Sequence, residues 1–212
     1  AGISVKKWNY PQAAFITQFQ HSKPHNNIST EFHTETGPFT LVPLSGLSSS
    51  VVCVVEPEQA ERLMQMPASE LAVDLEYRSQ FLLGKLTDFS QRQVFPMSSQ
   101  ISSLMASGNA FLVGESGHAF PPIGAQGLNL GFRDVQELAT RLQNISKSQI
   151  ATTADAYNKA RRMDVTTRTM GVDLLNRSLL VDFLPVQSLR SLGLFATKNI
   201  ATVRKAMMRQ GL

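Results

Sequence analysis

Glycine and proline are concentrated in one stretch of the 212-residue sequence, LVGESGHAFPPIGAQGLNLGFRD, which runs from Leu112 to Asp134. Glycine lacks a Cβ atom, so the backbone of such a loop can approach a ligand closely or take a positive φ. The end of the stretch is typical of a helix that starts near Gly127 or Leu128, and the free N–H groups of a helix start favour an anionic or electron-rich group. The pattern therefore predicts a strand, a rigid loop and a helix that could cradle a ligand with partial negative charge.

The spacing alone leaves two interpretations of this stretch open. It contains no GxxxxGK[ST] phosphate loop, and its glycines are not spaced as GxGxxG. The stretch is therefore either a ligand cradle or a structural strand–turn–helix whose glycines only allow tight packing.

Histidines offer a second candidate for chemistry, a metal site. His21, His25 and His33 lie close together in the sequence, but Pro24 makes HSKPHNN a loop rather than a helix that could present two ligands on one face. We therefore expect solvated loop and strand histidines and no metal.

A catalytic acid or base cannot be assigned from these residues. Glu56, Glu58 and Glu61 are typical of the acidic start of a helix rather than of paired catalytic carboxylates. His118 could titrate, but a structural hydrogen bond near the loop is the favoured role.

The elements that must position these residues begin with strands. Strand-like segments bounded by glycine, proline or polar connectors are AAFITQFQ, ISTEFHTE, GPFTLVPLSG, SSSVVCVVE, RQVFPMSSQIS and the short, buried NAFLVG. Several strands in a row favour an antiparallel sheet. The single cysteine, Cys53, lies in the most apolar of them, so we expect a buried and unreactive thiol.

Helical patterns follow the first strands. EPEQAERLMQM places Pro57 at a favoured first helical position. ASELAVDLEYRSQFLLGKL has apolar residues at helical spacing, namely Leu71, Leu75, Phe81 and Leu82. NLGFRDVQELATRLQ predicts an amphipathic helix whose apolar face is made by Leu128, Phe132, Val135, Leu138, Ala139 and Leu142. The order of elements predicts an α+β, or mixed α/β, fold that ends in a helical tail.

The tail, residues 176–212, carries the positive charge of the chain. It holds six basic residues against Asp182, whereas the whole chain has a net charge of +4. Apolar residues interleave with the basic ones, which suits packing on the domain or on another subunit, or contact with an anionic membrane or a partner. Packing is favoured and nucleic acid is not expected. No run of 18 apolar residues indicates a transmembrane helix.

The stretch GESGHAFPPIGAQGLNLGFRD closely resembles the second flavin-binding motif of the aromatic-ring flavoprotein monooxygenases. That motif has Gly-Asp-Ala-Ala-His, then Pro, then Gly-Gln-Gly-x-Asn-x-Gly and a later Asp. The matching positions are Gly114, His118, Pro122, Gly124, Gln126, Gly127, Asn129, Gly131 and Asp134. WNYPQAAFITQF, GPFTLVPLSG, RQVFPMSSQ and GLNLGFRDVQELA resemble the ubiquinone-biosynthesis hydroxylase branch, so the resemblance covers most of residues 1–175.

The resemblance implies a set of residues that bind FAD, namely Gly114, Glu115, Pro122, Gly124, Gln126, Gly127, Leu128 and Asn129. Glu115 stands where the family has the Asp that binds the ribityl chain, so one extra methylene must be accommodated. Pro122 matches the proline beside the reactive edge of the isoalloxazine. Leu128 and Asn129 match the backbone N–H donors to the pyrimidine carbonyl, where reduced flavin carries negative charge.

The resemblance also implies an activity, the hydroxylation of a polyprenyl phenol in ubiquinone biosynthesis with NAD(P)H and O2. It implies a substrate-domain sheet with helices over 1–105, the flavin motif over 106–145 and a C-terminal helical region over 146–212. The family also needs a GxGxxG fingerprint for the ADP half of FAD, and the sequence has none. We therefore expect the C-terminal part of a longer enzyme, which alone binds FAD weakly or not at all and is inactive.

A second hypothesis, from another class, is a non-catalytic domain that binds an apolar ligand or a partner through its sheet. Glu115 and the missing fingerprint would then mark an eroded flavin motif. The expected location is cytoplasmic, and peripheral at the inner membrane if the tail makes membrane contact. Oligomer formation is compatible with either hypothesis.

Overall fold

The computed structural model describes residues 2–122, 126–180 and 200. The chain divides into two compact units. The sheet unit is Asn9–Met97, and the helical unit comprises Ala1–Trp8 and Ser98–Leu212. The division into 1–105, 106–145 and 146–212 follows expected roles along the chain rather than packing, and it stays a prediction.

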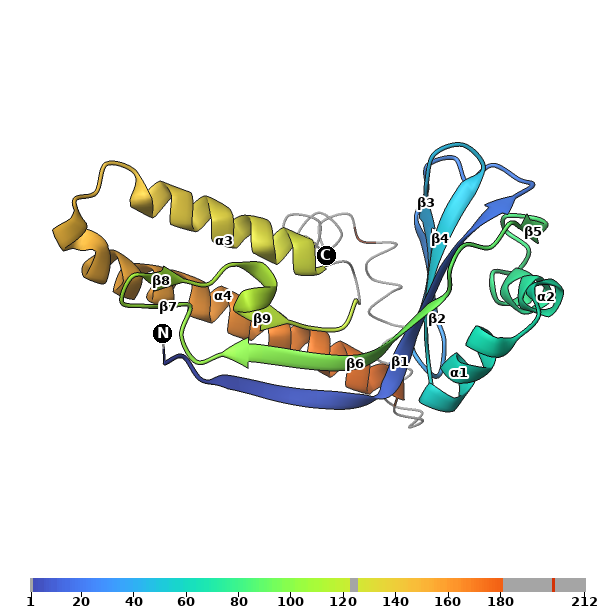
Figure 1. The fold of residues 1–212 in the computed structure, drawn as a ribbon, viewed down its shortest axis with the longest axis horizontal. Helices are drawn as coiled ribbons and strands as arrows, with labels where there is room; N and C mark the ends of the chain where they lie inside the picture. Colours follow the sequence, from blue (N-terminus) through green and yellow to red (C-terminus); the bar gives the residue numbers. More distant parts are fainter. Residues whose placement is uncertain (1, 123–125, 181–199, 201–212) are drawn as a thin grey trace. The chain divides into compact units, whose positions relative to one another are not determined.

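The sheet unit contains the antiparallel sheet that the strand-like segments predict (Figure 1). Its strands, in the order in which they pair, are β2 (Thr30–His33), β3 (Pro38–Pro43), β4 (Ser48–Val55) and β1 (Val5–His21, which begins in the helical unit). The short β5 (Leu86–Thr87) pairs with the end of β1. The helices α1 (Pro57–Gln65) and α2 (Ala68–Arg78) cover one face, so the mixed α/β class is confirmed.

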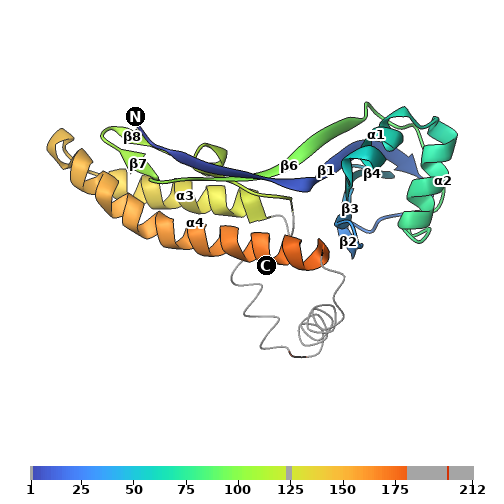
Figure 2. The same ribbon diagram turned by 90° about the horizontal axis from the view of Figure 1, so that it is seen from below.

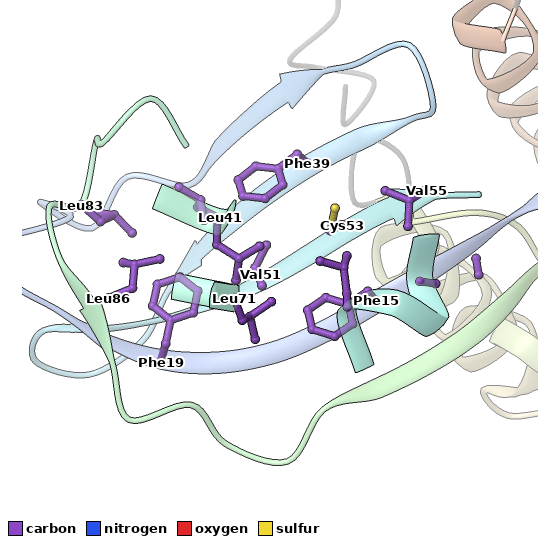
Figure 3. Packing of buried hydrophobic residues seen from close by; sticks show 14 residues of the cluster. Phe15, Phe19, Phe39, Leu41, Val51, Cys53, Val55, Leu71, Leu83 and Leu86 are labelled. Atoms are coloured by element: carbon purple, nitrogen blue, oxygen red, sulfur yellow. The ribbon is translucent and has the colours of Figure 1, made fainter. Parts of the chain in front are cut away.

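The core of the sheet unit lies between the sheet and these helices (Figure 3). Alternate residues of paired strands face it, as the register of Phe15, Cys53 and Phe39 across β1, β4 and β3 shows. Leu71 of α2 closes it from the other side and is fully buried. Cys53 is buried as expected, and this burial raises the pKa of its thiol to about 11.

The helix expected to continue to Leu82 ends earlier. Pro57 begins α1 as predicted, but α2 stops at Arg78, and Gln80 and Phe81 take positive φ angles of 53° and 56°. Phe81 and Leu82 are therefore exposed rather than part of a buried helix face. The sequence did not reveal this break, because Gln80 and Phe81 adopt positive φ angles that usually indicate glycine.

The helical unit contains short strands and two long helices. Its elements are β6 (Gln93–Ser102, which begins in the sheet unit), β7 (Ala106–Ser107), β8 (Ala110–Phe111), the 3-10 turn η1 (Gly114–Ser116), β9 (His118–Ala119), α3 (Gln126–Leu142), η2 (Lys147–Gln149) and α4 (Ile150–Leu180). β6 pairs with β9, and β7 pairs with β8. α3 and α4 run side by side in opposite directions (Figures 1 and 2). The expected strand NAFLVG shortens to two residues, which are half-buried.

The expected buried face of α3 is wrong. Leu128, Phe132 and Val135 are 70%, 63% and 51% exposed, and Ala139 and Leu142 are exposed as well. The buried side of α3 instead carries Leu130 and Asp134, with the half-buried Leu138 beside them. We call the outward-facing set Leu128, Phe132, Val135, Ala139 and Leu142 the α3 stripe.

Most of the basic tail lies outside the described residues, so the interpretations of 176–212 stay predictions. In the part of the chain that the structure does describe, no helix is long and apolar enough to cross a membrane.

Candidate flavin-binding site

The stretch from Leu112 to Asp134 links β8 to α3, as predicted from its glycines and prolines (Figure 1). The structure places Gly114 and Glu115 in η1, and Pro122 before the undescribed residues 123–125. The first turn of α3 contains Gly127, Leu128 and Asn129. Gly124 lies outside the described residues, as does the side chain of Gln126.

Two glycines let the loop approach the helix closely. Gly114 has a φ of +57°, which favours glycine. A Cβ atom built on Gly131 would lie 3.6 Å from the Cα of Gly114. A longer side chain at Gly131 would therefore press on the backbone of η1. The two glycines explain why η1 can rest on α3 one turn from its start.

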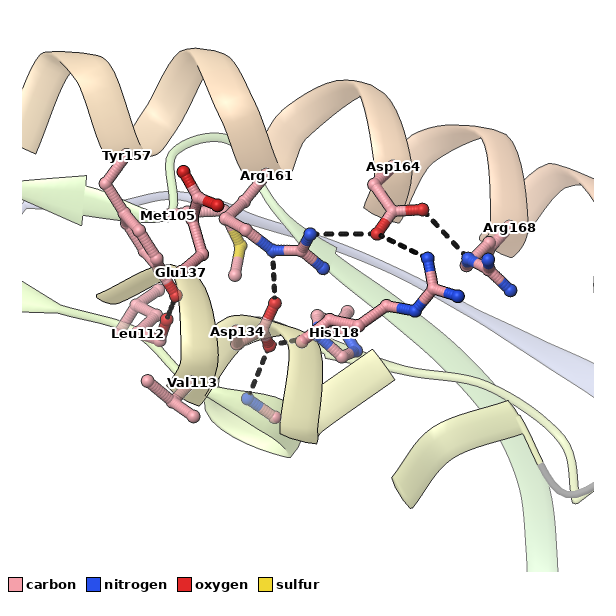
Figure 4. A network of polar contacts seen from close by, with 12 residues as sticks. Met105, Leu112, Val113, His118, Asp134, Glu137, Tyr157, Arg161, Asp164 and Arg168 are labelled. Carbon is pink, nitrogen blue, oxygen red and sulfur yellow. Dashed lines mark hydrogen bonds and ion pairs between the residues drawn. The ribbon is translucent and has the colours of Figure 1, made fainter. Parts of the chain in front are cut away.

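Asp134 fastens the loop to both helices (Figure 4). Its side chain is fully buried and accepts three hydrogen bonds: from His118 Nε2 at 2.7 Å, from the backbone N–H of Gly114 at 2.9 Å and from Arg161 Nε at 2.7 Å. Burial by itself would raise the pKa of Asp134, but these three donors hold it below its usual value. His118 thus makes the expected structural hydrogen bond.

A second layer of contacts surrounds this centre, partly within α4 and partly from α4 to its neighbours. Asp164 accepts hydrogen bonds from Arg161 Nη1 and Arg168 Nε, each at 2.8 Å, and lies 3.9 Å from Arg133 Nη1. Burial opposes ionisation of Asp164, but these partners lower its pKa. From the same helix, the Tyr157 hydroxyl donates to the Leu112 carbonyl at 2.8 Å (Figure 4). The loop is therefore clamped between α3 and α4.

On its outer side, the clamped loop remains open to a ligand. The side chain of Glu115 is exposed and makes no hydrogen bond among the described residues, while its backbone carbonyl accepts one from Gln100 Nε2 at 3.0 Å. Pro122 is exposed, whereas Pro121 is buried. No described atom lies within 4 Å of a Cβ built on Gly127, and the first N–H groups of a helix lack partners within that helix. These residues fit a flat, electron-rich ring with a hydroxylated chain.

Sequence reasoning missed the contribution of α4. Arg161 and Tyr157 complete the site from a helix that the motif does not include. Asp134 offered a partial signal, because it lies one turn after the apolar Leu130 on the buried side of α3 and would need a cationic or N–H partner there. Nothing in the sequence showed that Arg161 is that partner.

The histidines suggested as metal ligands lie elsewhere, and within the described ranges no three His, Cys, Asp or Glu side chains gather to hold an ion. His33 is exposed as expected. His21 is not solvated, however: it is 4% exposed and bonds Ser49 Oγ and the Lys23 carbonyl. It is a buried polar residue of the sheet unit, and both of its ring nitrogens are hydrogen-bonded.

A family model described as an FAD binding domain matches residues 4–171. Ubiquinone hydroxylase UbiL of Rhodospirillum rubrum is 28% identical, over all of this chain and 50% of its own length. The 3-demethoxyubiquinol 3-hydroxylase of Escherichia coli is 25% identical, over all of this chain and 55% of its own length. The chain thus spans about half the length of the curated relatives that it matches.

Solved structures share the fold. The p-nitrophenol 4-monooxygenase PnpA of Pseudomonas putida superposes with a TM-score of 0.71 at 19% identity, covering 98% of this chain and 54% of its own. The Diels-Alderase PyrE3 superposes with a TM-score of 0.70 at 16% identity, covering 99% of this chain and 46% of its own. At this level of identity the likeness shows the architecture and not the activity.

Proposed function

The chain belongs to the FAD binding domain family, and from that premise we propose that it is the part of a flavin-dependent monooxygenase that holds the flavin ring. The proposed reaction of the whole protein is the hydroxylation of a polyprenyl phenol in ubiquinone biosynthesis, with NAD(P)H as reductant and O2 as oxidant. The names of relatives that match this chain from end to end support the pathway and an aromatic substrate.

One observation carries the proposal: the loop clamped by Asp134 faces the open first turn of α3. When bound, FAD supplies the electron transfer and the oxygen chemistry. Glu115 would accept hydrogen bonds from the hydroxyl groups of the ribityl chain. The backbone N–H groups of Leu128 and Asn129 would donate to the pyrimidine side of the ring, where a preorganised helix start stabilises negative charge. Pro122 would border the ring.

The remaining candidates belong to the same proposed site. Gly114 lets η1 lie against α3, and Gly127 keeps the helix start clear for the ring. Gly124 and Gln126 are included on the motif alone.

The α3 stripe is the proposed docking surface for the part of the enzyme that holds the ADP half of FAD. Its three most exposed side chains repeat at helical spacing on the helix that begins at the proposed site. Burying a large apolar side chain contributes about 1.5–3 kcal/mol, so covering these side chains would stabilise the contact with a partner. The relatives are about twice as long as this chain, which leaves room for a domain that does so.

The direct test is the absorbance spectrum of the protein purified with its native upstream sequence restored. We expect a flavin spectrum whose bleaching by NAD(P)H is accelerated by a polyprenyl phenol, and only weak FAD binding by the 212-residue chain alone. A colourless protein that FAD cannot reconstitute would contradict the proposal and favour the non-catalytic binding domain.

A substitution sharpens this test at the residue that departs from the family. Glu115→Ala should weaken FAD binding by about 10- to 100-fold, since hydrogen bonds to a charged group contribute about 1.5–3 kcal/mol. The matched control is Glu58→Ala, which removes an exposed carboxylate from α1 in the sheet unit. Equal affinity in the two variants would show that Glu115 does not hold the cofactor.

A further inference from the structure

A cavity of about 150 Å³ opens at one end of the sheet unit, outside the proposed flavin site. It lies where β1 ends and β4 begins, beside the segment that follows α2. Its inner wall includes Leu41 and Leu83, each 3% exposed and both members of the core cluster (Figure 3). Ile28 and Leu82, 61% and 47% exposed, line it nearer the surface. The cavity therefore extends the core towards solvent.

Two polar side chains that line this cavity, those of His25 and Ser49, already bond other groups of the protein. His25 Nε2 bonds the Leu44 carbonyl at 3.0 Å, and its Nδ1 accepts from the backbone N–H of Asn27 at 3.0 Å. Ser49 Oγ bonds His21 Nε2 at 3.0 Å. None of the described lining residues is an acid, a lysine or an arginine. An occupant would therefore find no acidic, lysine or arginine side chain as a charge partner, and it need not offer a hydrogen bond to His25 or Ser49. The side chains of Asn26 and Thr30 also line the cavity, and water can solvate the exposed Asn26.

Two turns with unusual backbone geometry flank the cavity. Asn26 and Asn27 have φ angles of 52° and 56°, and Gln80 and Phe81 have 53° and 56°. Such angles are uncommon outside glycine, most of all for a bulky residue such as Phe81. The turn after α2 is held by a hydrogen bond from the Phe81 N–H to the Glu76 carbonyl at 2.8 Å. It ends the helix and directs the chain into Leu82 and Leu83, which line the cavity.

We propose that this cavity binds an uncharged hydrocarbon group of about six carbons, either a small free aromatic ring or the end of an isoprenoid chain. An apolar cavity of about 150 Å³ is large enough for benzene, and one isoprene unit has nearly the same size. The exposed apolar residues allow a longer chain to leave the cavity towards solvent. This site is separate from the flavin loop. An isoprenoid chain end as the occupant rests on the proposed function, whereas binding of a free ring does not.

The test is a titration of the 212-residue chain, with Ile and Leu methyl groups labelled with ¹³C, followed by NMR. The probes are benzene, 3-methylbut-2-en-1-ol, geraniol and, as a charged control, benzoate. We expect saturable shifts at the methyls of Ile28, Leu41 and Leu83 with uncharged probes, none with benzoate, and no change at Leu130 in the helical unit. Binding of geraniol would identify a chain end as the occupant, and binding of benzene alone would identify a free ring.

Variants distinguish specific binding in the cavity from nonspecific binding of apolar probes to the surface. Leu83→Phe fills the cavity and should weaken binding at least 10-fold, and Ile28→Trp, at an exposed position, should do so without disturbing the fold. Val73→Phe adds the same ring to an exposed site on α2 and should change nothing. Absence of saturable shifts with every uncharged probe, equal shifts with benzoate, or unchanged binding by Ile28→Trp and Leu83→Phe would overturn the proposal.

Discussion

The sheet unit and the helical unit bury different kinds of side chain. In the sheet unit, 14 residues form one apolar cluster that the sheet and two helices close between them. Among the described residues of the helical unit, the apolar cluster has six members, and it lies beside a buried network of charges around Asp134. The apolar side chains of α3 that could have enlarged this cluster point outward.

This difference indicates different tasks. A closed apolar core stabilises a unit through close-packed, non-directional contacts. A buried network of directed hydrogen bonds holds η1 and the start of α3 at defined distances, at the cost of desolvating several charges. The helical unit thus holds its loop at defined distances, while the α3 stripe stays exposed.

Each unit contains its own reporter, so the comparison can be tested. The chain has one tryptophan and one cysteine. Trp8 belongs to the helical unit, where its Nε1 donates to Asp173 at 3.1 Å. Cys53 is buried in the core of the sheet unit and becomes reactive to thiol reagents only when that unit opens. Fluorescence thus follows one unit and thiol labelling follows the other.

The largest effect is expected from Asp134→Ala. It removes the acceptor of His118 Nε2 and Arg161 Nε, although Arg161 Nη1 keeps Asp164, and breaking a buried ion pair costs about 3–5 kcal/mol. The Trp8 transition in urea should move to lower denaturant while Cys53 stays protected. Asp155→Ala removes an exposed carboxylate from α4 and should shift neither reporter. Equal opening at Cys53 would mean that the two units unfold as one.

Leu71→Ala should produce the converse result. Leu71 is fully buried in the core of the sheet unit, and such truncations cost about 2–5 kcal/mol. Labelling of Cys53 should accelerate in proportion, with little change in the Trp8 transition. Val73→Ala, on the exposed side of the same helix, is the matched control. A shift of the Trp8 transition as large as the change at Cys53 would contradict independent units.

Acid should act more strongly on the helical unit. Burial opposes ionisation of Asp134, Asp164 and Glu76, but their hydrogen-bond and charge partners lower all three pKa values. Stability from such groups is fully present above the unfolded pKa of about 4 and is lost as pH falls through the folded value.

Two of these three carboxyl groups, including the fully buried Asp134, belong to the helical unit. Between pH 5 and pH 2 the Trp8 signal should therefore change before Cys53 becomes reactive to dithiodipyridine, a reagent that works in acid. Exposure of Cys53 at the higher pH would assign the acid-sensitive contacts to the sheet unit instead.

Sequence patterns predicted local structure best where one force dominates. Strand-like composition and glycine or proline boundaries located β2 to β4 and the second half of β1, where burial of one face of the sheet decides the structure. The first half of β1, from Val5, was not predicted as a strand. The motif located the loop and the start of α3 because its glycines are required by close approach, as between Gly114 and Gly131.

Prediction from the sequence failed where the structure depends on contacts between residues far apart in the chain or on an unusual backbone angle. The apolar face of α3 was expected to pack in the core of its own unit, but its residues are exposed. Apolar periodicity identifies such a face but does not identify what packs against it. Arg161 was missed because its partner lies 27 positions earlier and the pairing depends on how α3 and α4 pack. The break after Arg78 was missed because Gln80 and Phe81 adopt an angle that their residue types rarely choose.

The smallest change in stability is expected for Phe132→Gln, which tests the other half of the comparison. Phe132 is 63% exposed at the centre of the α3 stripe, so its replacement should alter the free energy of unfolding by no more than about 0.5 kcal/mol. Exposed apolar patches favour association, so the unmodified chain should self-associate at high concentration and the variant should do so less. Sedimentation velocity measures this directly. Phe95→Gln makes the same change at a residue of similar exposure, 51%, in the sheet unit. If both variants reduce association equally, the α3 stripe is no more adhesive than other exposed apolar residues, and its proposed role as a docking surface fails.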